Sequence, residues 1–252
     1  MLLDLQRNII YGPVSSRRLG FSLGINLLPA AAKVCTFNCL YCQYGWTDFG
    51  ALADPGALGL PTAGEVVRAL EDALRRLERP PAFITFSGNG EPTVHPEFAR
   101  IAGEVAAVRD RLAPSARTAI LSNSTTAGDA EVRKALSGLD VRIMKLDAGT
   151  AAGFRNYNQP APGIELDSVV EGLRALGDVT LQALFTGGPR GNSAPDELAA
   201  WVRSVTSLAP RTVQIYSLAR GYPSGDIQPL DHAELESIGR RLAAAGTASE
   251  VY

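Results

Sequence analysis

Apolar and polar residues follow two spacings in turn along most of this chain, and the two spacings predict helices that alternate with strands. From Thr62 to Arg79 the apolar residues recur every three or four positions, which is the spacing of one helix face. They are Val66, Val67, Leu70, Leu74 and Leu77. The short apolar run 82–86 then ends at Ser87-Gly88, as expected of a buried strand.

The same alternation continues toward the end of the chain. Further helices are predicted over residues 96–112, 129–137, 166–176, 195–208 and 231–245. Further strands are predicted over 118–121, 141–146, 179–185 and 212–216, and residues 21–28 read as the first strand. Strands that alternate with helices imply right-handed crossovers and a parallel sheet. Because a closed barrel of this kind needs eight units and the sequence supplies six, we predict an α/β fold with a partial (β/α)6 barrel, open on one side.

Residues 1–252 are interpreted as a single domain, since no low-complexity linker divides the chain. Within it, residues 1–20 are expected to form an N-terminal strap, 21–30 the first strand, and 31–50 a long loop that follows it. In open parallel sheets the ligand binds at the carboxyl ends of the strands. Residues with a chemical role should therefore come directly after strands.

Composition narrows the functional classes. The apolar content of 46% is enough for a sizeable core, and the formal net charge is only −2. A protein that binds nucleic acid mainly by neutralising phosphates is usually more basic, although Arg17-Arg18 is a local basic pair. The sequence has neither a signal-peptide core nor an apolar run that could span a bilayer. We therefore expect a cytoplasmic protein with reduced thiols and no membrane partner.

The three cysteines of the chain lie within eight residues of one another, in the loop after the first predicted strand. Cys35, Cys39 and Cys42 have the spacing CxxxCxxC. Thiolates are the usual ligands of iron–sulfur clusters, and three of them leave one iron of a cubane open. A structural zinc site takes four ligands, and the two histidines of the chain, His95 and His232, are distant in the sequence. The motif therefore favours a [4Fe–4S] cluster over zinc or a chance grouping.

Polar residues follow the later strands, where the ligand is expected. They are Ser87-Gly88-Asn89-Gly90-Glu91-Pro92 after the second strand, Ser122-Asn123-Ser124 after the third, Lys145 and Asp147 at the end of the fourth, and Tyr216 in the sixth. Glycines allow the backbone to approach a ligand closely, although Gly-Asn-Gly by itself is only a turn. Lys145 could contact a ligand or simply pair with Asp147. Gln182 and Gln214 indicate a polar barrel interior. The loop Gly187–Asn192 could hold an anion, although a surface turn is its ordinary reading.

The cysteine motif, with an aromatic residue before its last cysteine, resembles that of the radical S-adenosylmethionine superfamily. The resemblance implies that the open iron chelates S-adenosylmethionine, which one electron cleaves to methionine and a 5′-deoxyadenosyl radical that abstracts hydrogen. It assigns the three cysteines as catalytic cluster ligands. It also implies cofactor-binding roles for Tyr41, Gly88, Asn89, Gly90, Glu91, Ser122, Asn123, Lys145, Asp147 and Tyr216.

The leading segment 11–20, together with segments 86–93, 145–150 and 213–218, is similar to small single-cluster radical enzymes often described as related to wyosine synthase. This leaves several functions open: hydrogen abstraction from a small molecule or peptide, modification of a tRNA base, or activation of a glycyl-radical enzyme. The absence of further cysteines for an auxiliary cluster argues against the tRNA function. An electron donor such as flavodoxin or ferredoxin is implied, and the non-enzymatic alternative is a zinc-stabilised binding module.

The arginine pair carries one further hypothesis. Arg17 and Arg18 precede the first predicted strand, and a strap that folds over the barrel mouth would bring one of them to an anionic group of the substrate or to a nearby acidic residue. The alternative is a solvated basic pair without a specific role.

Overall fold

One eight-stranded sheet organises the computed structural model, which describes residues 1–16 and 18–252. In spatial order its strands are β1 (Ile10–Ser16), β2 (Gly20–Ile25), β3 (Phe83–Phe86), β4 (Arg117–Ser122), β5 (Val141–Lys145), β6 (Thr180–Leu184), β8 (Thr212–Tyr216) and β10 (Ser249–Val251). Strands β7 (Thr186–Gly187) and β9 (Gln228–Pro229) form a small separate pair. In the large sheet every neighbouring pair from β2 to β10 is parallel, whereas β1 is antiparallel to β2.

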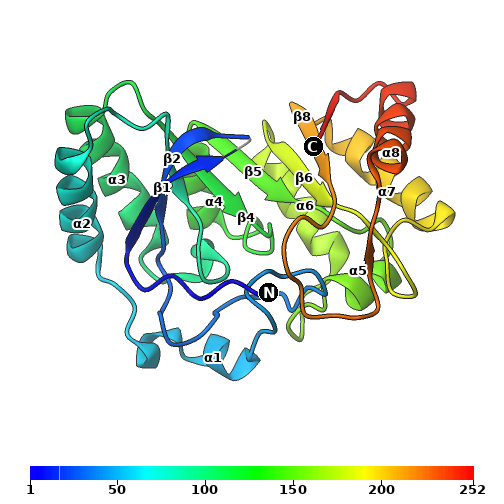
Figure 1. Ribbon diagram of the computed structural model, residues 1–252, viewed down its shortest axis with the longest axis horizontal. Coiled ribbons are helices and arrows are strands. Elements are labelled where there is room, and N and C mark those ends of the chain that lie inside the picture. Colours follow the sequence, from blue (N-terminus) through cyan, green and yellow to red (C-terminus); the bar gives the residue numbers. More distant parts are fainter. Residues whose placement is uncertain (17) are drawn as a thin grey trace.

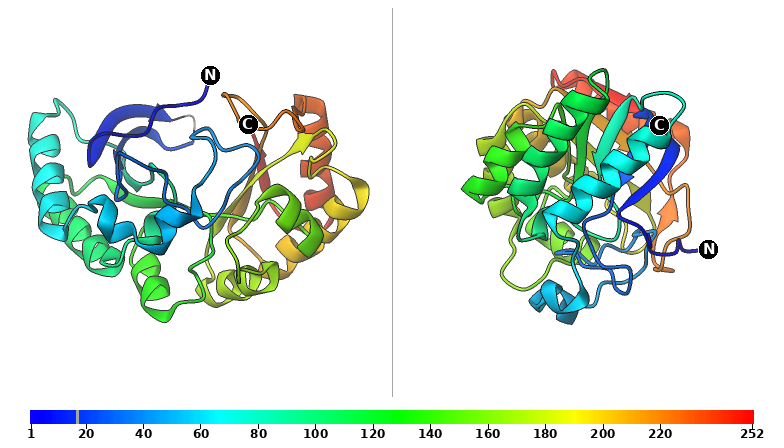
Figure 2. Two further views of the ribbon diagram at one scale, coloured as in Figure 1. Left: turned by 90° about the horizontal axis from the view of Figure 1, so that it is seen from below. Right: turned by 90° about the vertical axis from the view of Figure 1, so that its left-hand side faces the viewer.

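Helices connect the strands and cover the outer side of the sheet (Figure 1). They are α1 (Phe49–Ala53), α2 (Ala63–Arg76), α3 (Phe98–Leu112), α4 (Ala130–Ser137), α5 (Ala151–Tyr157), α6 (Leu166–Leu176), α7 (Pro195–Leu208) and α8 (His232–Ala244), with short 3₁₀ helices η1 (Pro55–Leu58) and η2 (Pro92–Val94). Helix α2 begins at a capping box in which Thr62 and Glu65 satisfy each other's backbone donors. The view from below shows an arc, with helices on its outer side and the N-terminal hairpin within its opening (Figure 2).

The six predicted strands are all present, as β2, β3, β4, β5, β6 and β8, and they form the predicted partial barrel. The sheet nevertheless has two more strands than we predicted. Strand β10 is only three residues long, which is too short for a recognisable pattern. Strand β1 lies inside the segment 1–20 that was expected to form an extended strap, and it pairs with β2 in a hairpin.

The first parallel strand is shorter than expected. It was predicted over 21–30 but ends at Ile25, and the chain then turns at Asn26. The Asn26 amide donates to the Leu28 carbonyl at 2.8 Å, and Asn26 Oδ1 accepts from Asn89 N at 3.0 Å. Asparagine side chains that bond to nearby backbone in this way compete with continued strand pairing.

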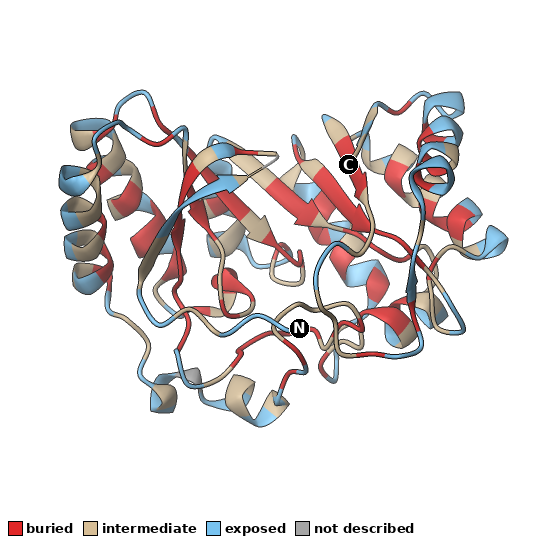
Figure 3. Ribbon diagram, viewed as in Figure 1, coloured by how far each residue is buried: buried red, intermediate tan, exposed pale blue. Residues whose placement is uncertain are grey.

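Alternation along the strands gives the sheet an apolar outer face and an inner face on which polar side chains lie among apolar ones such as Leu121 and Leu184. The residues that pack into the core beneath the helices include Leu23, Ile25, Ile84, Phe86, Ile120, Met144, Leu181, Val213 and Ile215. Their neighbours on the inner face include Ser22, Gly24, Thr85, Lys145, Gln182 and Tyr216. Figure 3 shows the buried strands between helices with exposed outer surfaces. Because side chains of a strand alternate between faces, the apolar runs of the sequence also provide the polar lining of the barrel.

In the part of the chain that the structure describes, no helix combines the length and the apolar character needed to cross a membrane.

Candidate functional site

The inner face of the barrel encloses a cavity of about 740 Å³, and all three cysteines border it. Most of the residues predicted from motifs that follow strands border it as well. They are Tyr41, Gly88, Gly90, Glu91, Ser122, Asn123, Lys145 and Tyr216. Asn89 and Asp147 are not among the described lining residues, and they lie behind the cavity wall.

The loop that carries the cysteines is held by backbone hydrogen bonds from two sides. Val34 N donates to Asn89 O at 3.0 Å, and Glu91 N donates to Val34 O at 3.0 Å. On the other side Leu40 N donates to Tyr157 O at 3.1 Å. These bonds attach the cysteine loop to the segment after β3 and to α5, so the cysteine positions depend on both elements.

Nitrogen donors and one buried cation surround the cysteine sulfurs. Asn123 Nδ2 lies 3.5 Å from Cys35 Sγ, and Asn158 Nδ2 lies 3.6 Å from Cys39 Sγ. Burial raises the pKa of Cys35 to about 12 and that of Cys39 to about 11. Burial by itself would lower the pKa of Lys33, but negative charge on the three cysteines outweighs it, and the pKa is raised. N–H donors and a cation beside three thiols suit an anionic sulfur cluster, so the donor set fits a [4Fe–4S] group.

Neither histidine can complete a zinc site with these cysteines. His95 Nε2 lies 3.0 Å from the Pro61 carbonyl, and His232 lies exposed on α8 beside Glu236. Among residues 1–16 and 18–252, no three histidine, cysteine or acidic side chains converge as ligands of one metal ion.

The two glycines of the Gly-Asn-Gly turn allow chain segments to approach each other. Gly90 has a φ of +143°, and a Cβ added there would lie 1.7 Å from the Val34 carbonyl oxygen. Gly88 has a φ of +132°, and its Cβ would lie 2.5 Å from Asn26 Oδ1. The sequence suggested that these glycines admit a ligand; in the structure they also let the turn pack against the cysteine loop and Asn26.

Asn89, between the two glycines, is fully buried and faces away from the cavity. Its Nδ2 donates to Gln6 O at 2.8 Å and Pro29 O at 2.9 Å, while its Oδ1 accepts from Gln6 N at 2.7 Å. These contacts use both N–H donors of the amide and place its oxygen on the N-terminal segment. Asn89 therefore holds the N-terminal segment in place, and we do not retain it as a cofactor ligand.

Glu91 is 1% exposed, and it organises the chain that follows β4. Its Oε2 accepts from Asn123 N at 2.5 Å, and its Oε1 accepts from Ser122 Oγ at 3.0 Å. Thr93 also donates to Oε1, through its backbone N at 3.1 Å and its hydroxyl at 2.6 Å. Burial raises the pKa of Glu91 in spite of these donors. Oε2 accepts one bond from the protein, so it retains capacity for another donor.

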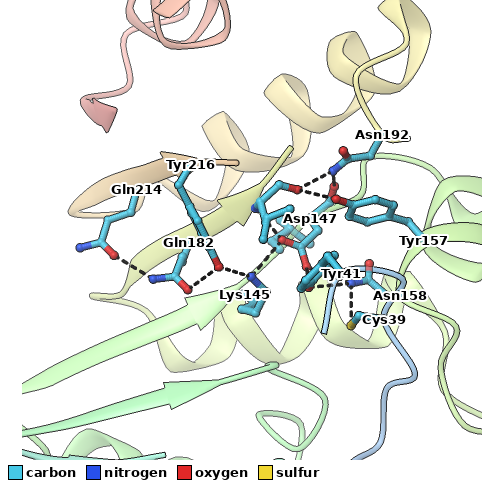
Figure 4. A network of polar contacts seen from close by, with 12 residues as sticks. Cys39, Tyr41, Lys145, Asp147, Tyr157, Asn158, Gln182, Asn192, Gln214 and Tyr216 are labelled. Atoms are coloured by element: carbon cyan, nitrogen blue, oxygen red, sulfur yellow. Dashed lines mark hydrogen bonds and ion pairs between the residues drawn. The ribbon is translucent and has the colours of Figure 1, made fainter. Parts of the chain in front are cut away.

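A second buried carboxylate, Asp147, is the centre of a polar network behind the cavity (Figure 4). Its Oδ2 accepts from the Tyr41 hydroxyl and from Asn158 Nδ2, the latter at 2.9 Å. Its Oδ1 accepts from Leu184 N at 2.9 Å and pairs with Lys145 Nζ at 3.2 Å. Asp147 thus links the cysteine loop, through Tyr41, to strand β6.

The network continues across the inner face as a row of hydrogen bonds. Lys145 Nζ donates to the Tyr216 hydroxyl at 3.0 Å, which donates to Gln182 Oε1 at 3.0 Å. Gln182 Nε2 donates to Gln214 Oε1 at 3.0 Å. Burial would lower the pKa of Lys145, but Asp147 and Tyr216 outweigh it and raise the pKa, so this side chain is an ammonium group.

One asparagine of this network, Asn158, was missed in the sequence analysis, and another, Asn192, was named there only as part of the Gly187–Asn192 loop. Asn158, at the end of α5, contacts both Cys39 and Asp147. Asn192 Nδ2 donates to Asp147 O at 2.8 Å and Leu184 O at 2.9 Å, so this part of the Gly187–Asn192 loop bonds to the protein itself. Thr150, which caps α5 by accepting from Gly153 N, was the available sequence signal for that helix.

The N-terminal hairpin borders the cavity from the open side of the barrel. The hydroxyl of Tyr11, in β1, lies 2.5 Å from Ser87 Oγ. The Arg18 guanidinium lies 4.6 Å from the centroid of the Tyr216 ring and 5.7 Å from that of Tyr252. Arg18 is thus not a solvated side chain remote from the site, and Arg17 lies outside the described residues.

Comparisons with known proteins bear on the family and the fold of this chain. A model of the radical SAM superfamily matches residues 32–202. A UPF0026 protein of Synechocystis is 35% identical over 182 residues, which cover 71% of this chain and 61% of that protein. A Brachyspira hyodysenteriae protein named GTPase Obg is 28% identical over 245 residues, which cover 95% of this chain and 34% of that protein. The chain thus spans less than two thirds of the length of either relative.

Solved structures agree with the partial barrel. A radical SAM methyltransferase from Sphaerobacter thermophilus superposes with a TM-score of 0.67 at 16% identity, over 92% of this chain and 65% of that chain. A structure of TYW1 with a lysine–pyruvate adduct superposes with a TM-score of 0.61 at 14% identity, over 88% of this chain and 73% of that chain. At such low identities these likenesses support the fold alone.

Proposed function

The chain belongs to the radical SAM superfamily, and from this premise we propose that Cys35, Cys39 and Cys42 hold the [4Fe–4S] cluster with which the enzyme cleaves S-adenosylmethionine. The observation that carries the proposal is the convergence of three thiols, sulfur-directed amides and the Lys33 cation on one cavity. When bound, the reduced cluster would supply the electron that splits S-adenosylmethionine into methionine and a 5′-deoxyadenosyl radical, for abstraction of hydrogen from a small-molecule or peptide substrate.

The protein's own residues would bind and orient S-adenosylmethionine. Glu91 Oε2 has acceptor capacity left for the ammonium of the methionine moiety, and burial strengthens such a contact. Ser122 and Asn123 border the same part of the cavity and would face its ribose or carboxylate. The Tyr41 ring borders the cavity while its hydroxyl is fixed on Asp147, so it could cover the adenine.

A lysine adduct of the kind named for the TYW1 structure finds little support in this cavity. Such an adduct needs a neutral amine. Lys33 and Lys145, the lysines among the described lining residues, both have raised pKa values, because negative groups beside them outweigh the effect of burial. We therefore favour a small molecule or peptide over a tRNA base as substrate. Activation of a glycyl-radical enzyme is a further alternative that would use the same hydrogen abstraction.

Cleavage of S-adenosylmethionine by anaerobically reconstituted protein tests the proposal. Radical SAM enzymes require a reductant, so flavodoxin or ferredoxin with its reductase would supply electrons, and dithionite would serve as the chemical control. We expect iron and sulfide to be incorporated and 5′-deoxyadenosine to form. Deuterated candidate substrates would transfer label into that product.

Alanine variants of the cysteines provide the matched control. Two thiolates leave a cubane held at only two corners, so Cys35→Ala, Cys39→Ala and Cys42→Ala should each lose the cluster and the cleavage activity. Full iron content and normal cleavage in any one of them would refute the ligand assignment. If the wild type incorporates zinc and does not cleave S-adenosylmethionine, the result would instead support the non-enzymatic alternative, a zinc-stabilised binding module.

A further inference from the structure

We propose that Arg18 is a substrate-binding residue that receives an anionic group, a carboxylate or a phosphate, inside the barrel cavity. The inference rests on the function proposed above, because it concerns the substrate of that same site. It starts from the position of Arg18, in the turn between β1 and β2, from which the side chain reaches Tyr216 near the far edge of the sheet.

Arg18 has donor capacity that the protein leaves unused. Its Nη1 is buried and has no hydrogen-bond acceptor among the described residues. Glu250, which borders a smaller cavity together with Arg18, accepts from the Tyr252 hydroxyl at 2.6 Å. A buried guanidinium N–H without an acceptor is costly, and a bound anion would remove that cost.

The contact of Arg18 with Tyr216 does not use the hydrogen-bond donors of the guanidinium. The Arg18 Cζ lies 4.6 Å from the centroid of the Tyr216 ring. A cation–π contact of this kind involves the ring and the positive charge, so Nη1 keeps its N–H donors for another partner. Because Tyr216 is itself held by Lys145 and Gln182, the arginine rests on a fixed support. Such support suits bidentate recognition of a carboxylate or phosphate.

The charge of the large cavity also favours an anion. Its described lining contains four cationic side chains, Arg18, Lys33, Lys145 and Arg220, and one carboxylate, Glu91. Lys145 is paired with Asp147, and Lys33 Nζ donates to the Gly45 carbonyl at 2.8 Å, so both ammonium groups already have partners within the protein. Arg18 Nη1, by contrast, is a buried cationic donor of this lining for which the described residues provide no acceptor.

The smaller cavity, of about 230 Å³, is the less suitable place for the anion. Arg18 borders it too, but so do the carboxylates of Asp140, Asp178 and Glu250. Its other arginines are engaged, since Arg142 and Arg211 both pair with Asp178, and Arg117 donates to the Asp140 carbonyl at 3.3 Å. Because its three carboxylates offset most of its positive charge, whereas the larger cavity has one carboxylate against four cations, the larger cavity is where Arg18 would receive the anion.

Binding of simple anions to cluster-loaded protein, without reductant, tests the inference separately from turnover. The probes are succinate, inorganic phosphate and neutral succinamide, titrated by calorimetry at low salt. We expect one of the anions to bind the wild type and succinamide not to bind. Arg18→Gln should weaken that binding by roughly 10- to 100-fold, as expected for a lost charge-assisted contact, and Arg18→Lys should lie between. The anion that binds more tightly identifies the substrate's charged group.

Arg79 offers a matched control for loss of an arginine–aromatic contact. Its guanidinium lies 4.3 Å from the Phe21 ring centroid, next to the same hairpin but not among the lining residues. Arg79→Gln should therefore leave anion binding unchanged. The inference is wrong if the wild type and a folded Arg18→Gln variant bind the probes equally, or if the wild type binds neither anion. Arg18 would then have a structural role only, as a contact between the β1–β2 turn and Tyr216 of β8. Failure of the wild type to cleave S-adenosylmethionine would overturn the proposed function instead.

Discussion

At the scale of single residues, the site contains two buried carboxylates whose surroundings suit them to different tasks. Asp147 bonds to an amide, a phenol, a backbone N–H and an ammonium group, all supplied by the protein. Glu91 also borders the cavity and keeps acceptor capacity on Oε2. Asp147 is therefore best interpreted as a residue that positions Tyr41 and Lys145, and Glu91 as the one that can contact a ligand.

Substitution of Glu91 tests this distinction. Glu91→Gln removes the charge but keeps the size of the side chain, so S-adenosylmethionine should bind about 10- to 100-fold more weakly while iron content is retained. Equilibrium titration of the reconstituted variant measures the change. The control is Glu97→Gln, which changes an exposed carboxylate at the start of α3. This variant should bind S-adenosylmethionine normally. Unchanged affinity in Glu91→Gln would move the ammonium contact elsewhere, and loss of iron would reduce Glu91 to a structural role.

Lys33 lies buried beside the cysteines, and its positive charge should influence the reduction of the cluster. A nearby cation stabilises the added electron, so Lys33→Gln should shift the midpoint potential to more negative values, on the order of tens of millivolts. A redox titration followed by electron paramagnetic resonance measures the shift. Lys134→Gln, on the exposed surface of α4, is the matched control. An unchanged potential in Lys33→Gln would mean that the ammonium does not sense the charge of the cluster.

At the scale of elements, the cluster loop depends on a contact between two backbones. Gly90 has no side chain, and only for that reason can the turn after β3 bond to Val34 on both sides. Gly90→Ala should therefore release the cysteine loop and reduce both iron content and thermal stability, because the φ of +143° is also unfavourable for alanine. Iron analysis and thermal unfolding provide the readouts.

A glycine in a different setting separates this effect from the general consequence of adding a methyl group. Gly103 is exposed in the middle of α3, with open space around its Cα. Gly103→Ala should increase stability by about 0.5–1 kcal/mol through helix propensity and leave the cluster unchanged. Normal cluster content in Gly90→Ala would show that the loop can be held without this contact.

The same scale explains which elements the sequence could reveal. The parallel strands and the helices between them were predictable, because each buries one regular apolar face. Strand β10 and helix α5 were missed, since they are short and gain their stability from packing against neighbours. The cysteine spacing was visible in the sequence, whereas the position of Asn158 at the Cys39 sulfur follows from the path of α5. Contacts of this kind depend on tertiary structure and leave no local pattern.

At the scale of the whole molecule, many basic side chains of the described residues are paired with acidic ones. Many of the arginines on the outer helices and at the strand ends contact acidic neighbours. Among them are Arg75, Arg100, Arg109, Arg111, Arg142, Arg155, Arg211 and Arg240. With a formal net charge of −2, the molecule has no net positive charge to offer a phosphate backbone.

This charge distribution predicts that transfer RNA binds weakly and that its affinity falls only slightly as the salt concentration rises. A protein that neutralises six to ten phosphates loses roughly 10³–10⁵ in affinity between 50 and 200 mM salt, and paired arginines cannot release counterions to that extent. Fluorescence anisotropy with labelled tRNA, over that range of potassium chloride, measures the slope for the cluster-loaded protein. We expect micromolar or weaker binding at the lower salt concentration. The slope of log affinity against log salt concentration should correspond to the release of no more than a few counterions. Tight binding with a steep slope would instead restore a tRNA base as the substrate, and the anion received by Arg18 would then be a backbone phosphate.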